Sequence, residues 1–400
     1  MTGKPMVDEM TSRERVLATF EHESTDKVPI SFTGVACRIA SELLGREAYV
    51  GFGIQGWREA KALWKGEHSH QEFLERSLLD AFELAKAMDQ DVVRYKYWTT
   101  APSTRPAEKR DEYTFVYGDP KGKWRLMRYD PGTELYSTIA QYPPKQKLTY
   151  ESIEKRLSER EEQLERPCPG LIRLFREERN IAEVRAVMET LGREYAIRVG
   201  GGGISIPQDS ATWLAATVRR PDLVARLLDI QAEMAVRRIN ALARVGVKLV
   251  WGGGDFASNK GPFYSPRAFH ELMLPRLQRI SEACHKHGMY YLFASDGNLW
   301  PVADDLFGKS GVDGYYEIDR RAGMNLRKLR ERFPDLTLIG NISSHTLSQG
   351  TRDDVIVEVL SCLKESKRSG GIIVGCSNMI VGNTPKENFD AMTKTIREHR

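Results

Sequence analysis

Several features that mark whole classes of protein are missing from this sequence. Its 5 cysteines are scattered, odd in number and never arranged as Cys-x-x-Cys: Cys37, Cys168, Cys284, Cys362 and Cys376. That usage argues against a disulfide framework and a zinc finger, and it suits a reducing cytoplasm. No apolar run approaches the roughly 20 residues that span a membrane, and residues 1–10 show no signal-peptide core. We expect a cytoplasmic protein with no membrane segment.

An excess of charge of one sign is also missing. Lys and Arg number 59 against 55 Asp and Glu, a formal net charge of +4, and no basic block stands out. This balance predicts no nucleic-acid partner. Hydrophobic residues make up 41% and charged residues 28% of the 400 residues, which excludes a disordered chain and supplies a large core. By its length the chain suits two average domains or one large barrel, and no internal repeat or low-complexity linker divides it.

Strand and helix patterns alternate along most of the chain. A capping box at Thr11–Glu14 opens the first helix, and a 3.6-residue apolar period predicts helices over 70–88 and 222–245. Short apolar runs predict strands at 27–32, 92–98, 248–251, 289–293, 313–316, 336–339 and 372–374. Such alternation implies parallel strands joined by helical crossovers.

Two closures of a parallel sheet compete, an open doubly wound sheet and a (β/α)8 barrel. The open sheet usually carries a G-x-G-x-x-G motif after its first strand. That motif is missing here: the nearest match starts at Gly200 and has Ser205 at the third glycine position. We therefore predict an α/β fold built as a single (β/α)8 barrel.

Residues 113–140 break the alternation. Tyr113, Phe115 and Tyr117 alternate with polar residues, and a turn at 119–122 leads into a second extended run. The pattern predicts an antiparallel hairpin inserted into the barrel. Its aromatic side chains either pack as a half-buried strand or roof a flat substrate.

Polar side chains follow five of the predicted strands. They are Asp255, Asp296, Glu317, Asn341 and Cys376. In a barrel, the residues after each strand line the carboxyl-terminal mouth, where reactions take place. Asp and Asn at such positions also serve in turns and caps, but carboxylates gathered at one mouth repel each other unless they share a cation or a proton. Asp, Glu and Cys are all competent zinc ligands, so a metal is one such cation.

Two other motifs allow a structural explanation. The glycine runs at 200–203 and 252–254 either cradle a phosphate through backbone N–H groups or form tight turns. His285 and His287 form a His-x-His pair that ends a predicted helix and precedes a strand. That position lies at the opposite end of a barrel from the mouth, where positive charge complements a helix C-terminus.

Motifs along the whole chain resemble the uroporphyrinogen decarboxylase superfamily. Those motifs are Arg13–Leu17, Asp26–Pro29, Asp255 with Gly261–Pro266, Ser295–Asn298, Gly340–Ile342 and Thr384–Asn388. The resemblance implies one (β/α)8 barrel, a single domain over residues 1–400. Haem-pathway members carry an N-terminal Arg-Gln-Ala-Gly-Arg-Tyr motif whose arginines bind substrate carboxylates, whereas residues 32–38 here contain only Arg38. A substrate with many carboxylates would lack its cationic clamp, so we expect no decarboxylation of uroporphyrinogen.

The other branch that the chain resembles is the corrinoid-dependent methyltransferases, which use zinc at the barrel mouth and exchange methyl groups with a separate corrinoid protein. Thiol-methylating members have His-x-Cys after one strand and a Cys after the last strand. The matching positions here are Ala294 and Asp296, with Cys376 near the final ligand. These departures favour a harder Asp/Glu/Cys site, or no metal. Members that act on methoxylated aromatics or methylamines vary their ligands in this way.

The resemblance therefore implies a cytoplasmic methyltransferase component. It would move a methyl group between a small methylated substrate and the cobalt of a partner corrinoid protein. Asp296, Glu317 and Cys376 would hold zinc, which polarises the substrate's heteroatom, and Asp255 would carry a proton or add a ligand. Barrels of this kind often form homodimers.

Further roles and rival functions stay open. Asn298 and Asn341 would orient the substrate, and Arg320 or Arg321 would bind a substrate carboxylate or simply face solvent. One rival is a metal-free decarboxylase-like lyase, in which the clustered carboxylates protonate a carbanion. Another is a barrel that binds a ligand without catalysis. Metal content separates the methyltransferase from the lyase. Ligand binding without turnover would indicate the non-catalytic barrel.

Overall fold

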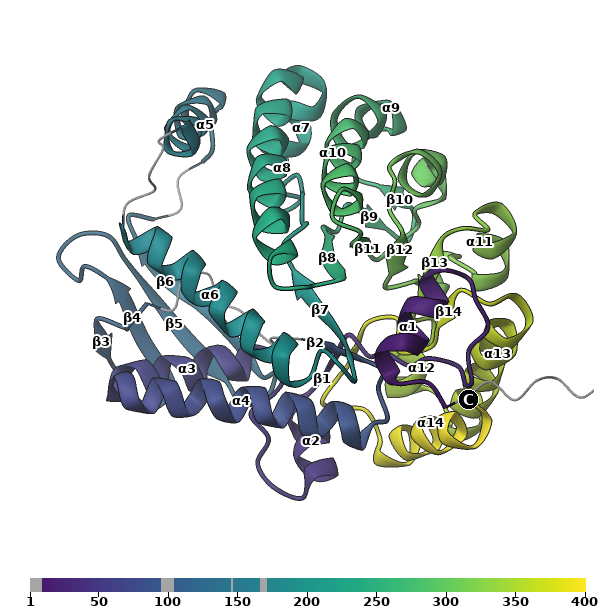
Figure 1. Ribbon diagram of the computed structural model, residues 1–400. Helices are drawn as coiled ribbons and strands as arrows, with labels where there is room; N and C mark the ends of the chain where they lie inside the picture. The colour runs from purple at the N-terminus through teal and green to yellow at the C-terminus, as the bar shows by residue number, and fades with distance from the viewer. Residues whose placement is uncertain (1–8, 95–103, 145–146, 166–170) are drawn as a thin grey trace, which may run out of the picture.

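A computed structural model describes residues 9–94, 104–144, 147–165 and 171–400 (Figure 1). Residues 95–98 of the predicted strand 92–98 and Cys168 lie outside the described residues. The predicted helices 70–88 and 222–245 correspond to α4 (Glu67–Ala87) and α8 (Pro221–Ala243).

Seven parallel strands form one curled sheet in the order β14-β13-β12-β11-β8-β7-β2. These strands are β2 (Val92–Arg94), β7 (Ala196–Gly200), β8 (Leu249–Gly253), β11 (Tyr290–Ala294), β12 (Gly314–Tyr316), β13 (Thr337–Ile339) and β14 (Ile372–Ile373). An extended segment, residues 28–33, fills the gap between the two edges: Ile30 bridges Val374 in parallel, and its carbonyl accepts a hydrogen bond from the Asp91 amide at 2.8 Å. Eight extended segments thus close the predicted barrel.

Helices surround the strands on the outside of the curled sheet (Figure 1). The remaining α-helices are α1 (Ser12–Phe20), α2 (Cys37–Leu44), α3 (Gly53–Lys65), α5 (Tyr150–Glu165), α6 (Leu171–Thr190), α7 (Ala211–Arg219), α9 (Pro266–Ala268), α10 (Leu274–His285), α11 (Leu326–Arg332), α12 (Ser344–Gln349), α13 (Arg352–Ser369) and α14 (Lys386–His399). The Thr11 side chain accepts from the Glu14 amide and the Glu14 side chain accepts from the Thr11 amide, so the predicted capping box opens α1. Among the described residues, no helix is both long and apolar enough to cross a membrane.

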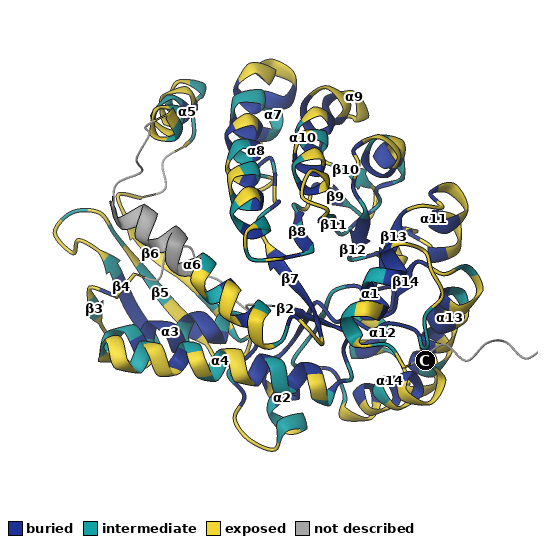
Figure 2. Ribbon diagram, viewed as in Figure 1, coloured by how far each residue is buried: buried dark blue, intermediate teal, exposed yellow. Residues whose placement is uncertain are grey.

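The barrel strands are largely buried (Figure 2). Their buried side chains alternate between two apolar layers. The inner layer fills the barrel with Val92, Ala196, Leu249, Leu292, Ala294, Tyr316, Ile339 and Ile373, and Val16 and Phe20 of α1 belong to it. Their sequence neighbours, such as Val93, Ile197 and Val250, belong to the layer that packs against the helices. Successive strand residues point to opposite faces, so this division tells which later residues face the barrel interior.

The predicted hairpin is part of a larger antiparallel sheet. Four strands pair in the order β3-β4-β5-β6: β3 (Glu108–Lys109), β4 (Thr114–Gly118), β5 (Trp124–Asp130) and β6 (Leu135–Tyr142). Phe115 is fully buried, and the Tyr113 ring packs against Trp57 of α3 and Tyr129 of β5. These aromatic side chains hold the sheet against α3, which is the packing role rather than a roof over substrate.

Short strand pairs complete the fold. β1 (Gly34–Val35) pairs with β15 (Met379–Ile380) in parallel, and β9 (Ala257–Ser258) pairs with β10 (Gly261–Pro262) in antiparallel fashion. β9 and β10 follow β8, and β15 follows β14. These pairs therefore lie beyond the carboxyl ends of barrel strands, the end at which the candidate site is found.

Candidate functional site

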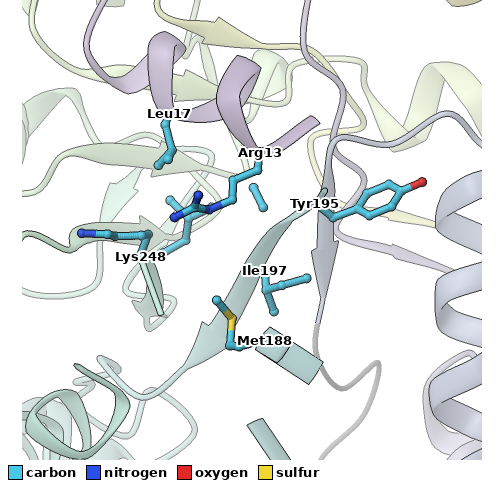
Figure 3. A pocket seen from close by; sticks show the side chains of 8 residues that line it. Arg13, Leu17, Met188, Tyr195, Ile197 and Lys248 are labelled. Carbon is cyan, nitrogen blue, oxygen red and sulfur yellow. The ribbon is translucent and has the colours of Figure 1, made fainter. Parts of the chain in front are cut away.

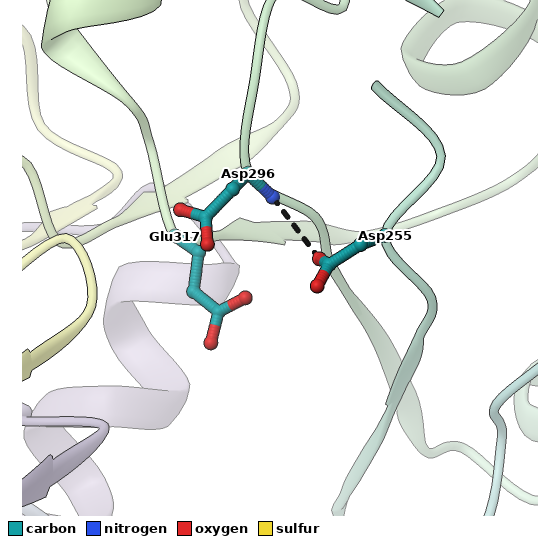
Figure 4. A group of neighbouring side chains, drawn as sticks. All are labelled: Asp255, Asp296 and Glu317. Atoms are coloured by element: carbon teal, nitrogen blue, oxygen red, sulfur yellow. Dashed lines mark hydrogen bonds between the residues drawn. The ribbon is translucent and has the colours of Figure 1, made fainter. Parts of the chain in front are cut away.

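Three carboxylates from three different strand ends meet at the barrel mouth (Figure 4). One oxygen each from Asp255, Asp296 and Glu317 lies within 4.8 Å of the others. Asp255 is exposed, whereas Asp296 and Glu317 are partly buried. The Asp296 amide donates to Asp255 Oδ1 at 3.4 Å. These residues follow β8, β11 and β12, so the barrel gathers side chains that are far apart in the sequence.

Strand alternation accounts for the inward direction of Asp296, which is two residues beyond the inner-layer residue Ala294 at the end of β11. Asp255 lies in the loop two residues after β8 ends at Gly253, and that loop brings it to the cluster. Glu317 directly follows the inward Tyr316, so simple alternation would turn it outward. Its backbone instead has φ +67°, a left-handed conformation that costs a non-glycine residue on the order of 1 kcal/mol. That reversal brings Glu317 into the cluster.

Burial and the crowding of negative charge raise the pKa of two of the carboxyl groups. Burial, then the charges of Asp296 and Asp255, raise the pKa of Glu317 to about 8, against the lowering effect of Arg198 and Arg94. Burial, then the charges of Asp255 and Asp319, raise the pKa of Asp296 to about 6. The cluster therefore needs either a proton or a bound cation at neutral pH.

Two arginines inside the barrel belong to this site, although the sequence analysis did not single them out. Arg94 of β2 and Arg198 of β7 are register partners on adjacent parallel strands, and each is two residues beyond an inner-layer residue. Arg198 is 3% exposed and lies against the Tyr316 and Trp251 rings, at 4.5 and 5.2 Å from their centroids. A charged residue at the same position of two otherwise apolar strands was the available sequence signal.

Amide side chains support the carboxylates from the neighbouring loops. Asn378, which the sequence analysis did not single out, donates from Nδ2 to Asp296 Oδ2 at 2.5 Å. Asn341 Nδ2 donates to the carbonyls of Ile318 at 3.2 Å and Met324 at 3.5 Å. Asn341 thus fixes the loop that follows Glu317 and is 5% exposed. Its contact with substrate stays a prediction.

The structure does not bring Cys376 into the carboxylate cluster. Its side chain is fully buried in the outer layer, and its Sγ lies 3.3 Å from Ser344 Oγ. Burial raises the pKa of the Cys376 thiol to about 11. Ile373 faces the barrel interior and Val374 faces the helices, so Cys376, two residues beyond Val374, also faces the helices. Asp255 occupies the third position of the cluster instead.

The other predicted substrate-binding residues lie in capping turns. Asn298 Oδ1 accepts from the Trp300 amide at 3.1 Å. Arg320 and Arg321 are exposed in a turn whose Asp319 side chain accepts from the Arg321 amide at 3.0 Å. Arg320 lines an open hollow of about 410 Å³ that residues of α12 and α13 also line. The structure shows no contact between these two exposed arginines and the carboxylate cluster, unlike the interior pair.

The glycine runs mark places where strand-end backbones pack closely. A Cβ at Gly252 would lie 2.2 Å from the Gly202 carbonyl oxygen, and one at Gly253 would lie 2.1 Å from the Ala294 carbonyl oxygen. Gly253 also has φ +134°, which disfavours any other residue. Backbone crowding explains this run, so the tight-turn alternative accounts for it without a bound phosphate.

A hollow at the opposite end of the barrel is too small to serve as a substrate site. It measures about 10 Å³, about the space of one water molecule, and Arg13, Tyr195 and Lys248 are among the residues that line it (Figure 3). His285 also lies at this end, with Nε2 2.9 Å from an oxygen of Asp313. The carboxyl-terminal mouth is therefore the candidate active site.

Known proteins resemble this chain over nearly all or about half of its length. Methylcobamide:CoM methyltransferase MtaA from Methanosarcina barkeri is 22% identical over 403 residues, which cover 98% of this chain and 99% of that protein. Another MtaA sequence, from Methanosarcina barkeri strain Fusaro, is 26% identical over 225 residues, or 54% of this chain and 62% of that protein. The solved structure of a methyltransferase from Methanosarcina mazei matches with a TM-score of 0.63 and 19% identity, covering 98% and 99% of the two chains. This structural match confirms the fold.

A family model identifies the group to which the barrel belongs. The model described as uroporphyrinogen decarboxylase (URO-D) matches residues 199–399. This range contains all three clustered carboxylates and six of the seven sheet strands in whole or in part. The chain is a member of the uroporphyrinogen decarboxylase (URO-D) family.

Proposed function

We propose that this protein is a methyltransferase that moves a methyl group between a small methylated substrate and the corrinoid of a separate protein. The observation that carries the proposal is the cluster of Asp255, Asp296 and Glu317 at the mouth of a URO-D family barrel. The near-full-length similarity to methylcobamide:CoM methyltransferases supports methyl transfer over decarboxylation. Methoxylated aromatics and methylamines are the substrate classes that we expect.

The three carboxylates suit a divalent metal ion. Their oxygens are hard, anionic donors that bind zinc and other divalent cations, and their raised pKa values indicate an electrostatic need for positive charge. A bound zinc ion would act as a Lewis acid toward the heteroatom that carries the methyl group. Cys376 lies outside the cluster, so we propose a site with oxygen donors from Asp255, Asp296 and Glu317.

The residues around the cluster would position both the ligands and the substrate. Asn378 holds one oxygen of Asp296 and leaves the other directed to the cluster. Asn341 anchors the loop that keeps Glu317 in its left-handed conformation. The exposed side of Asp255 leaves the cluster open toward solvent, from which substrate and the partner's corrinoid would approach.

A lyase is the second candidate, and one observation favours it. With a pKa of about 8, Glu317 retains its proton at neutral pH when no metal is bound. Such a carboxylic acid can donate that proton to the carbanion left when carbon dioxide departs from a substrate. A metal-free preparation with decarboxylase activity would support this function over methyl transfer.

The two functions can be separated with purified protein. Metal content is measured by elemental analysis, and methyl transfer is followed from methoxylated aromatics and methylamines to cob(I)alamin by the change in its absorption spectrum. We expect bound metal and methylcobalamin formation, with both lost in Asp296→Asn. Glu271→Gln, on the exposed face of the turn after α9, is the matched control. Absence of methylcobalamin together with carbon dioxide release from carboxylic acids would establish the lyase instead.

A further inference from the structure

The barrel interior beside the carboxylate cluster holds hydrogen-bond donors that lack acceptors. Among the described residues, Arg198 Nη1, Trp251 Nε1 and Thr33 Oγ1 are buried and have no hydrogen-bond partner. Arg198 as a whole is 3% exposed. Buried polar atoms are nearly always paired, and leaving one unpaired costs about 1–3 kcal/mol. A group of unpaired donors in one place indicates a ligand that supplies acceptors.

These donors belong to one assembly inside the barrel. The Arg198 and Arg94 guanidinium carbons lie 5.2 and 5.9 Å from the centroid of the Trp251 ring. Arg94 Nη1 donates to the Thr33 carbonyl oxygen at 3.3 Å, which places the unpaired Thr33 hydroxyl in the residue beside Arg94. Trp251 retains partial exposure, so the assembly is not sealed in the core.

The chemistry of these donors selects an anion. Two guanidinium groups carry positive charge, and the Trp251 indole can only donate. Arginine recognises carboxylates through paired N–H groups. The negative charges of the cluster face the same space, since the charges of Arg198 and Arg94 act on Glu317. An anion therefore binds on the arginine side, with the rest of the molecule extending toward the carboxylates.

We propose that Arg198, Arg94 and Trp251 bind the carboxylate of a small methylated acid and direct its methyl-bearing end to the Asp255, Asp296 and Glu317 cluster. The identity of the reacting end rests on the proposed methyltransferase function. The anion-binding subsite stands on the interior donors alone. The substrate class is thereby narrowed from small methylated compounds to those that carry a carboxylate.

Methoxyacetate and methoxyacetamide are a matched pair of probes, because they have nearly the same size and differ in charge. Isothermal titration of the metal-free protein is expected to show binding of methoxyacetate and at least about tenfold weaker binding of methoxyacetamide, since hydrogen bonds to charged groups contribute about 1.5–3 kcal/mol. Equal affinity for the two probes, or binding of neither, would overturn the proposal.

Variants locate the binding site. Arg198→Met is expected to weaken methoxyacetate binding at least about tenfold. Trp251→Phe, which keeps an aromatic but smaller ring and removes the N–H donor, is expected to weaken it about threefold to tenfold. Arg267→Met, at an exposed residue of α9, is the control and is expected to leave the affinity unchanged. Loss of binding in Arg320→Met with retention in Arg198→Met would overturn the proposal. Should Arg198→Met fail to fold by circular dichroism, Trp251→Phe and Arg198→Lys carry the test, and full affinity in both would overturn it.

The alternative role for Arg198 is to neutralise Glu317 only. In that case Arg198→Met changes zinc affinity and leaves methoxyacetate binding unchanged, which contradicts the subsite. Methyl transfer from neutral substrates without any methoxyacetate binding would overturn the subsite and leave the proposed function standing. Binding of methoxyacetate without methyl transfer from any substrate would support the subsite and contradict the proposed function.

Discussion

Replacing Glu317 by Gln should change how the stability of the metal-free protein depends on pH. Burial and the nearby Asp296 and Asp255 raise the pKa of Glu317 from its ordinary 4.5 to about 8. Because the folded-state pKa lies above the unfolded one, this carboxyl group contributes most stability below about pH 4.5. That contribution is lost as the pH rises and is gone above about pH 8. Gln has nearly the same shape and cannot ionise, so the variant lacks this loss.

The size of the effect follows from the pKa change. At about 1.36 kcal/mol for each pH unit between the two pKa values, the wild-type protein loses about 4 kcal/mol between about pH 5 and about pH 8 through Glu317. For a chain of 400 residues, that loss lowers the midpoint of thermal unfolding by about 5 °C. The Glu317→Gln protein should avoid this part of the decrease and be the more stable of the two at about pH 9.

Scanning calorimetry of chelator-treated protein across this pH range is the assay. Glu271→Gln serves as the matched control and should follow the wild type, because the Glu271 carboxylate is exposed and pairs with Arg267 on the surface. Zinc should stabilise the wild type most at high pH, where the carboxylates are ionised, and should stabilise Glu317→Gln much less. Parallel pH dependences for the wild type and Glu317→Gln would refute the argument that the cluster raises the pKa of Glu317.

Three further predictions concern other residues of the account. Asp255→Asn should lower the metal stoichiometry measured by elemental analysis, whereas Cys376→Ser should leave it unchanged. The Cys376→Ser variant should lose only about 1–3 kcal/mol of stability, because it buries a hydroxyl group. The opposite pattern of metal loss would show that the Cys376 thiolate is a ligand. Asn341→Ala should destabilise the protein in calorimetry by about 1–3 kcal/mol, because the Ile318 carbonyl loses its donor. The variant should also bind metal more weakly. Unchanged metal affinity would show that Asn341 does not position the ligands. Anaerobic incubation with uroporphyrinogen should yield no coproporphyrinogen by chromatography, because Arg38 already donates to backbone carbonyls at 2.6 and 2.9 Å; clear turnover would show that the carboxylate clamp is not needed.

The barrel was readable from the sequence because its strands and helices alternate regularly. Because Asp255, Asp296 and Glu317 follow predicted strands, they could be predicted to line the mouth, and the structure brings them together. The hairpin was underestimated because β6 is exposed along nearly its whole length, so it has no alternating apolar pattern to indicate a strand.

The orientation of individual strand-end side chains was not readable. Parallel strands buried on both faces form continuous apolar runs, and the run from Ile372 to Val374 gives no sign of which face Cys376 joins. The inward turn of Glu317 depends on a positive φ at a glutamate, which no local residue preference predicts. The pairing of Arg94 with Arg198 depends on the register between β2 and β7, which the sequence does not reveal.

We propose that oxygen ligands from three strand ends of this barrel hold a metal ion. X-ray absorption at the zinc edge, on the protein loaded with one equivalent of zinc, tests that claim directly. We expect zinc to be coordinated by oxygen donors at about 2.0–2.2 Å with no sulfur, and we expect that spectrum to be lost in Asp296→Asn. A sulfur ligand at about 2.3 Å would contradict it, since that distance requires a thiolate such as Cys376.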